Sequence, residues 1–115
     1  MITINKSIYK ARANVAKALA HKTRLQIIDI LAEEGEHCVC ELTDILAVSQ
    51  SSVSKHLSVL KKAGIVDSEK DGLKVNYILR TPCIRNFFKC IDQILHEDLK
   101  RKMEELEPMG GGRND

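Results

Sequence analysis

Two cysteines, Cys38 and Cys40, are separated by a single valine near the middle of this chain. Thiolate sulfur is a soft ligand that prefers As(III), Sb(III), Cd(II), Pb(II), Cu(I) or Zn(II) to Mg²⁺ or Ca²⁺. Residues two apart on a regular helix point about 200° away from each other, so both thiols can bind one ion only if the helix unwinds there. The pair predicts a thiophilic metal or metalloid site whose occupation deforms the surrounding backbone.

Three other residues are candidate ligands for this site. His37 directly precedes the pair. Cys83 and Cys90 lie seven residues apart and therefore share one face of a helix. These two cysteines complete the Cys38 and Cys40 site, form a separate site, or pack as small apolar residues in an interface.

The composition indicates a folded, mostly helical chain. Hydrophobic residues make up 43% of the 115 residues, whereas aromatic residues make up only 3% and tryptophan is absent. A core of Leu, Ile, Val and Ala suits packed helices better than a β-sandwich. No apolar stretch approaches the roughly 18 to 20 residues that cross a bilayer, and the N-terminus lacks an apolar signal core. We therefore expect a cytoplasmic protein without membrane contact, in which cysteines bind metals or sense redox state rather than form disulfides.

The charges are distributed unevenly although the net charge is only +2. Residues 1–24 carry six basic groups and no acid, and residues 25–49 carry six acids and neither Lys nor Arg. Residues 50–80 carry six basic groups against three acids. The acidic segment contains Cys38 and Cys40 and favours cations, whereas the basic segment suits contacts with phosphate.

Apolar periodicity predicts three helices in the first half of the chain. The first spans residues 5–20. The second starts near residues 21–23, where Thr23 can act as the N-cap, and ends at Gly35. A short third helix spans residues 39–46.

A fourth helix follows the turn at residues 47–49, with Ser49 as its N-cap and Gly64 at its end. Alternating residues on either side of Asp71-Gly72 predict a β-hairpin between residues 65 and 79. A last helix runs from Cys83 to Leu106 and carries more apolar surface than a small domain covers, so we expect a homodimer. Residues 108–115 have the composition of a disordered tail.

The fourth helix has the pattern of a DNA-recognition helix followed by a wing. Val53, Leu57 and Leu60 fall on its inner face, and short polar side chains on the other face permit close approach to the major groove. His56 is ambiguous, since it either contacts DNA or orients the helix from behind. The candidate DNA-binding residues are Gln50, Ser51, Ser52, Ser54, Lys55, His56 and Ser58 of the helix, with Lys70 and Lys74 at the hairpin tip.

Four motifs in this order resemble the ArsR/SmtB family of winged helix-turn-helix repressors, over about residues 8 to 100. They are Leu19-Ala20-His21-Lys22-Thr23-Arg24-Leu25, Cys38-Val39-Cys40-Glu41-Leu42, Ser49-Gln50-Ser51-Ser52-Val53-Ser54-Lys55-His56-Leu57 and Lys62-Ala63-Gly64-Ile65-Val66. The resemblance implies a mainly α fold with a small β-hairpin, dimerising through its N- and C-terminal helices. It also implies a repressor that leaves its operator when a metal or metalloid binds. Arsenic-responsive members typically carry a third cysteine three residues after the second, where this chain has Thr43.

These observations predict one winged helix-turn-helix domain over residues 1–107. It would be a homodimeric repressor of double-stranded operator DNA, induced by As(III), Sb(III) or another thiophilic ion such as Cd or Pb, with no organic cofactor. The third ligand is left open among His37, a small-molecule thiol, and Cys83 or Cys90 of either subunit. The alternative is a repressor of the same fold whose cysteines sense oxidants or persulfide. An enzyme is not expected, because His37 beside Cys38 is a poor dyad and no third orienting residue is evident.

Overall fold

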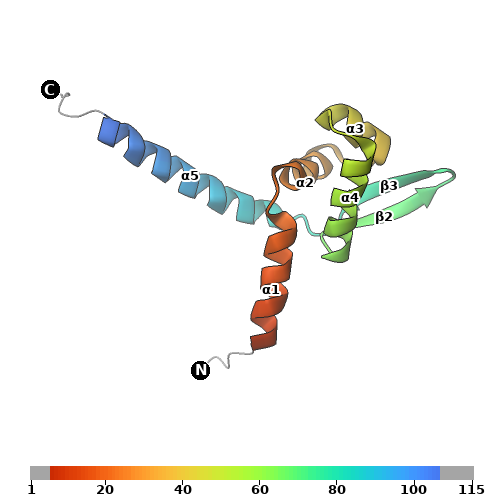
Figure 1. Ribbon diagram of the computed structural model, residues 1–115, viewed down its shortest axis with the longest axis horizontal. Helices are drawn as coiled ribbons and strands as arrows, with labels where there is room; N and C mark the ends of the chain where they lie inside the picture. The colour runs from red at the N-terminus through yellow and green to blue at the C-terminus, as the bar shows by residue number, and fades with distance from the viewer. Residues whose placement is uncertain (1–5, 107–115) are drawn as a thin grey trace. The chain divides into compact units, whose positions relative to one another are not determined.

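The computed structural model describes residues 6–106, and backbone contacts divide the chain into two compact units, residues 1–82 and residues 83–115. The described part of the first unit runs, in chain order, through α1 (Lys6–Leu19), α2 (Lys22–Glu34), β1 (His37–Cys38), α3 (Val39–Leu46), α4 (Gln50–Lys62), β2 (Val66–Asp71) and β3 (Lys74–Leu79) (Figure 1). The second unit contains α5 (Ile84–Leu106). The predicted mainly helical chain with a small β-hairpin is confirmed. The predicted tail, residues 108–115, lies outside the described residues.

The α2 helix begins one residue after His21 rather than at Thr23. The His21 backbone is extended, and its Nδ1 accepts a hydrogen bond from the Thr23 backbone N–H at 3.1 Å. The prediction of Thr23 as N-cap is therefore wrong, because Thr23 is already inside the helix and is buried. The helix ends at Gly35, as predicted, and the Gly35 N–H donates to the Leu31 carbonyl.

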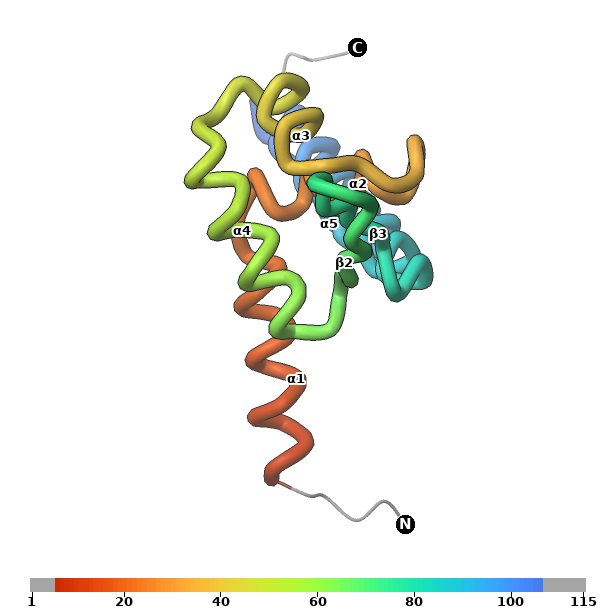
Figure 2. Tube along the Cα trace, turned by 90° about the vertical axis from the view of Figure 1, so that its right-hand side faces the viewer, coloured from red at the N-terminus to blue at the C-terminus, as the bar shows by residue number. Residues whose placement is uncertain are grey.

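The α4 helix begins and ends where the sequence predicts. The Ser49 Oγ accepts a hydrogen bond from the Ser52 N–H at 3.2 Å and caps the first turn. A short connection joins α3 to this helix (Figure 2). Beyond the last turn, the Ile65 N–H donates to the Leu60 carbonyl at 3.0 Å. This closure requires a left-handed residue, which Gly64 supplies at φ 82° without a Cβ clash. Both ends of the predicted recognition helix are thus fixed by local sequence.

The sheet is antiparallel and has the strand order β1-β3-β2. In the hairpin, Asp71 pairs with Lys74, so the two turn residues are Gly72 and Leu73. The turn lies one residue later than the predicted Asp71-Gly72, and Gly72 adopts φ 65° there. The third strand, β1, was not predicted: its two residues pair as His37 with Tyr77 and Cys38 with Asn76.

The core of the first unit is aliphatic and includes side chains from α2, α3, α4 and β2. The predicted inner face of α4 is confirmed, because its three apolar residues are completely inaccessible to solvent. The fully buried large side chains are Ile27, Ile28, Leu42, Val53, Leu57, Leu60 and Val66. Leu42 anchors α3 in this core, and α3 packs against α4.

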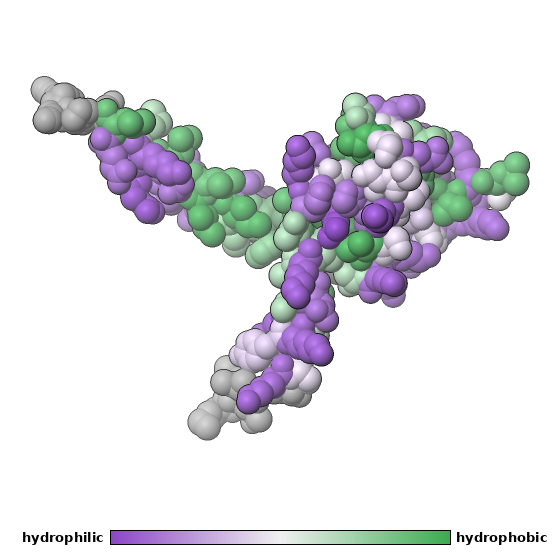
Figure 3. Space-filling model, viewed as in Figure 1, coloured by the Kyte–Doolittle hydropathy of each residue, from purple (hydrophilic) through white to green (hydrophobic). Residues whose placement is uncertain are grey.

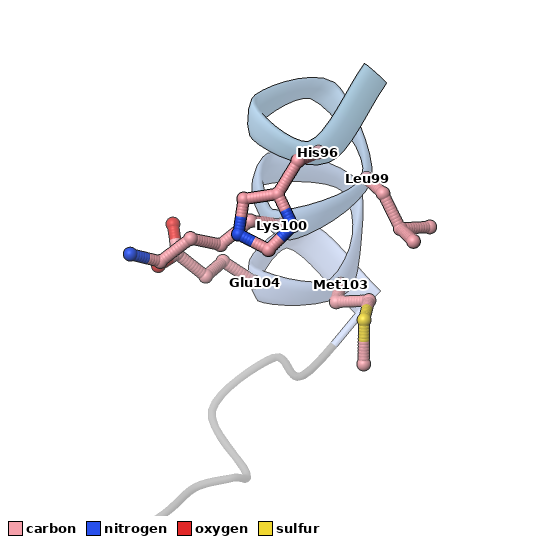
Figure 4. Close-up of a pocket in the computed structure, with 5 residues that line it drawn as sticks. All are labelled: His96, Leu99, Lys100, Met103 and Glu104. Carbon is pink, nitrogen blue, oxygen red and sulfur yellow. The ribbon is translucent and has the colours of Figure 1, made fainter. Parts of the chain in front are cut away.

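The α5 helix, described by itself, contains no buried residue. Apolar surface appears at several points along it (Figure 3), and its exposed large apolar residues are Phe87, Ile94, Leu95, Leu99, Met103 and Leu106. Near its end, Leu99 and Met103 lie on one side, away from His96, Lys100 and Glu104 (Figure 4). None of the helices in the described part of the chain is long and apolar enough to cross a membrane.

Candidate functional site

The α4 helix turns a polar face away from the core. The exposed residues on this face are Gln50, Ser51, Ser54, Lys55 and Ser58. Ser52 is half-buried, and its backbone N–H is held by the Ser49 cap. Apart from Ser52, these polar side chains are therefore accessible to solvent on the face of α4 that points away from the core.

The hairpin presents two exposed lysines beside its turn. Lys74 pairs with Asp71 next to the turn, and Lys70 pairs with Val75 one step further back. The hairpin is also tied to α4, because the Lys61 Nζ donates to the Ser68 Oγ at 2.6 Å. The exposed face of α4 and the lysines of the hairpin therefore belong to one connected structure.

His56 does not share the exposed face of α4, so its inclusion among DNA-contacting residues requires a correction. It lies three residues after Val53 and four before Leu60, and this spacing places it on the inner face, where it is only 9% exposed. Its Nδ1 accepts a hydrogen bond from the Arg24 Nε at 3.0 Å, and its ring centroid lies 4.3 Å from that of His21. Burial lowers the pKa of His56, and the neighbouring positive charges lower it further.

Cys38 is the N-cap of α3. Its backbone is extended, at φ −85° and ψ 169°, and its Sγ accepts a hydrogen bond from the Glu41 N–H at 3.4 Å. The Glu41 Oε1 in turn accepts one from the Cys38 N–H at 2.9 Å, which completes a capping box. The Cys38 side chain is only 3% exposed. One of the two candidate thiols therefore also holds the first turn of the helix that supports α4.

Cys40 is exposed beside this buried cap. A hydrogen bond with the Cys38 side chain raises the pKa of the Cys40 thiol, and partial desolvation and the Cys38 charge raise it further. The Glu41 N–H and the Lys74 charge lower the pKa of Cys40, but by less. The premise that both cysteines lie within a helix is wrong, because Cys38 precedes α3 and its extended backbone brings the two side chains together. Of the two cysteines, only Cys40 therefore has helical backbone geometry.

The other candidate ligands are His37, Cys83 and Cys90. His37 donates its Nδ1–H to the Gly35 carbonyl at 2.8 Å, and its Nε2 lies 3.6 Å from a carboxylate oxygen of Glu34. Cys83 and Cys90 are exposed and belong to the second unit. Within residues 6–106, no three His, Cys, Asp or Glu side chains are arranged to hold a metal ion. The described geometry joins Cys38 and Cys40 and supplies no third protein ligand.

The helix and hairpin arrangement agrees with the known proteins that this chain resembles. Residues 21–68 match a family model described as bacterial regulatory protein, arsR family. An uncharacterized HTH-type transcriptional regulator from Methanocaldococcus jannaschii is 38% identical over 86 residues, covering 75% of this chain and 97% of that protein. The chain belongs to the ArsR family. It is accordingly a transcriptional repressor and not an enzyme.

Two further relatives are named for metal or metalloid resistance. A cadmium resistance transcriptional regulatory protein from Listeria innocua is 41% identical over 73 residues, covering 64% of this chain and 61% of that protein. An arsenic resistance transcriptional regulator from Pseudomonas putida is 46% identical over 65 residues, covering 56% of this chain and 51% of that protein. This ArsR-family chain therefore spans between half and two thirds of the length of these regulators.

A solved structure confirms the fold of this ArsR-family chain. A homodimeric winged helix-turn-helix DNA-binding domain from Mycobacterium bovis, a possible ArsR-family transcriptional regulator, matches with a TM-score of 0.71 at 27% identity. The match covers 88% of this chain and 95% of that domain. The predicted winged helix-turn-helix fold is confirmed.

Two residues of the site escaped the sequence analysis. Glu41 was counted only as an acid, although a Glu three residues after a capping residue signals a capping box. Arg24 reaches α4 from a position 32 residues earlier, and no local pattern announces such a contact. Glu41 hydrogen-bonds to Cys38 and Arg24 hydrogen-bonds to His56, both of which are candidate site residues.

Proposed function

We propose that this ArsR-family repressor is a homodimer that binds operator DNA and releases it when a thiophilic metal or metalloid binds Cys38 and Cys40. One observation carries the proposal: a buried thiol forms the N-cap of α3, with a second thiol beside it and the recognition helix packed against α3. Ligand capture at this position acts directly on the base of the DNA reader.

The DNA-contacting surface in this proposal consists of α4 and the hairpin. The α4 helix supplies Gln50 and the exposed serines to base edges and phosphates, with Lys55 as a phosphate contact. Lys70 and Lys74 reach the flanking backbone from the hairpin. Ser52 is a weaker candidate than its neighbours because it is half-buried.

Dimerisation follows from the apolar surfaces of the terminal helices. In α1, Ile8, Tyr9 and Val15 are 44%, 50% and 37% exposed, and in α5 Leu99 is 59% exposed. Helices with such uncovered apolar stripes are stabilised by burial against a partner. The M. bovis domain of the same fold is described as homodimeric. A dimer would present two recognition helices to two half-sites of the operator.

The inducing ion needs more ligands than these two sulfurs. Trigonal As(III) and Sb(III) sites use three donors and tetrahedral Cd(II) sites use four, so the remaining ligands come from a small-molecule thiol, from His37, or from Cys83 or Cys90 of either subunit. We favour As(III) and Sb(III), with Cd(II) and Pb(II) as the next candidates, since the relatives include both arsenic and cadmium resistance regulators.

Release begins at the N-cap of α3. When the Cys38 sulfur binds an ion, its lone pairs turn from the Glu41 N–H to the ion, and the first turn of α3 loses its cap. Loss of an N-cap costs about 1 kcal/mol, which corresponds to roughly a fivefold change in an equilibrium constant. Cys38 also pairs with Asn76 of β3, so a displacement of Cys38 on ion binding would also displace the hairpin. The loss of the cap alone reaches the lower end of the range of about 1 to 3 kcal/mol that is typical of allosteric coupling.

The rival signal is oxidation or persulfide transfer at the same thiols. Its specific support is the contact between the Cys38 and Cys40 side chains, one of which is exposed to solvent. An ion and an oxidant can both react first at exposed Cys40, so only direct comparison of the two signals separates them.

Fluorescence anisotropy of labelled promoter DNA tests the proposal. The reduced, metal-free protein should bind the DNA, and sub-stoichiometric to stoichiometric As(III) or Cd(II) should release it. Cys40→Ser should bind the DNA as well as the wild type does but resist release. Asp44→Ser, at another exposed position of α3, is the matched control and should both bind the DNA and respond to the ion. Release by peroxide or persulfide alone, with no effect of any thiophilic ion, would refute the metal signal and support the redox alternative.

A further inference from the structure

Arg24 of α2 joins three helices of the first unit. Its Nε donates to the Nδ1 of His56 in α4 at 3.0 Å. Its Nη1 lies 3.3 Å from the Lys17 carbonyl and 3.2 Å from the Ala18 carbonyl at the end of α1. The Arg24 guanidinium therefore connects α4 to α2 and to the last turn of α1.

This arrangement requires a neutral His56. Because the Arg24 Nε–H is the donor, the His56 Nδ1 must offer a lone pair, and its proton resides on Nε2. Protonation of Nδ1 would place two N–H groups against each other and add a charge next to the guanidinium. Burial first, and then the charges of His21, Arg24 and Lys55, lower the pKa of His56 and oppose that protonation.

Among residues 6–106, the groups that shift the pKa of His56 include no acid. The α4 helix packs against α1, α2, α3 and β2. The charged groups that act on His56 are His21 at the start of α2, Arg24 within α2 and Lys55 of α4 itself. No carboxylate of α3 or β2 takes part, and α1 contributes the two carbonyls that bind Arg24. A proton on His56 would thus meet only positive neighbours.

Two other roles fit this cluster less well. A metal site is disfavoured because the Nδ1 atoms of His21 and His56 already accept hydrogen bonds and a guanidinium stands beside them. A direct DNA contact is disfavoured because His56 is buried on the inner face of α4. The contacts of Arg24 instead fix the orientation of α4, the helix that carries the proposed groove-reading side chains.

We propose that Arg24 and His56 are positioning residues for DNA recognition, and that protonation of His56 detaches α4 from Arg24 and weakens the grip on the operator. The inference rests on the proposed DNA-binding function and adds acid sensitivity to it. Release in acid would be accompanied by proton uptake and would not involve the cysteines.

The sign of the pH dependence separates this role from a direct contact. A histidine that touches phosphate gains affinity when it is protonated, because it adds a positive charge at the polyanion. A histidine that positions the helix through a neutral Nδ1 loses affinity when it is protonated. Basic DNA-binding surfaces normally bind more tightly in acid, so a decrease is a specific signature.

The experiment measures promoter affinity by anisotropy from pH 7.5 to 5.5, with reduced, metal-free protein at constant ionic strength. The wild type should lose affinity several-fold, because His56 takes up a proton more readily when α4 is detached from Arg24 than when its Nδ1 accepts the guanidinium N–H. His56→Asn retains an acceptor near the Nδ1 position and cannot titrate, so it should bind at pH 7.5 within about threefold of the wild type and remain nearly flat in acid. The three other histidines, His21, His37 and His96, are unchanged in this variant and cancel in the comparison.

Arg24→Lys provides a second variant that keeps the charge but loses the fork-shaped donor. It should bind more weakly at pH 7.5, with a flat pH profile and an unchanged salt slope, because no phosphate contact is lost. Circular dichroism at both pH values confirms that each protein is folded. Wild-type affinity that stays level or rises in acid would overturn the inference, as would a His56→Asn profile equal to that of the wild type. No DNA binding at pH 7.5 would instead refute the proposed function.

Discussion

Replacing Cys38 by alanine should destabilise the protein even when no metal is present. The substitution removes the sulfur that accepts the Glu41 N–H at 3.4 Å and leaves half of a capping box. Loss of an N-cap costs about 1 kcal/mol, within a range of roughly 0.5 to 2. For a domain of about this size, 1 kcal/mol lowers the melting temperature by roughly 4 to 8 °C. Cys38→Ser should lose less, because serine is itself a favoured N-cap.

Thermal unfolding of the reduced, chelator-treated proteins provides the assay. All variants are compared at one protein concentration, because the stability of a dimer depends on concentration. Cys40→Ser is the matched control: its thiol is exposed and caps nothing, so its stability should stay within about 0.5 kcal/mol of the wild type. Equal melting temperatures for Cys38→Ala and Cys40→Ser would refute the structural role of the first thiol.

Three further predictions follow from burial and charge. Leu57→Ala should cost about 2 to 5 kcal/mol in urea unfolding, because Leu57 is completely buried, whereas Ser58→Ala on the exposed face should cost less than about 0.5 kcal/mol. Leu99→Glu on the apolar side of α5 should convert a dimer to monomer in sedimentation equilibrium, whereas Lys100→Glu on the other side should not (Figure 4). The pKa of His56 lies below its ordinary 6.5 in the folded chain, so the unfolded chain binds the proton first. The contribution of this residue to stability is therefore complete above pH 6.5 and is lost as the pH falls below it, which urea titrations of wild type and His56→Asn should show as a difference confined to acid.

Sequence patterns predict the helices and the hairpin because each is long enough to display a period. The apolar residues of α4 recur at helical spacing, and Ser49 and Gly64 are local signals for its two ends. β1 contains only two residues, which show no period, and its existence depends on pairing with β3. Its prediction would require knowledge of the hairpin's position in space.

The local geometry expected for the predicted cysteine pair differs from the one in the structure. The motif identified the thiols, but helical spacing was applied to Cys38, which is extended. The capping role could have been recognised from Glu41 three residues later, although cysteine is not among the usual N-cap residues. Likewise, the spacing of His56 from Val53 and Leu60 already placed it on the inner face, while its polarity suggested the outer one. A buried polar group needs a hydrogen-bond partner, and Arg24 provides one for His56. Arg24 is distant in sequence, so local patterns do not reveal this contact.

Thermodynamic reciprocity tests the proposed coupling between the thiols and the DNA reader most directly. If an ion at Cys38 and Cys40 weakens operator binding by some factor, the operator must weaken ion binding by the same factor. We would measure the affinity of the reduced protein for Cd(II) or As(III), free and saturated with operator DNA, by competition with a chelator or dithiol. The account predicts a decrease on DNA of at least about fivefold, equal to the loss of DNA affinity caused by the ion. Equal ion affinities on and off the operator would contradict it.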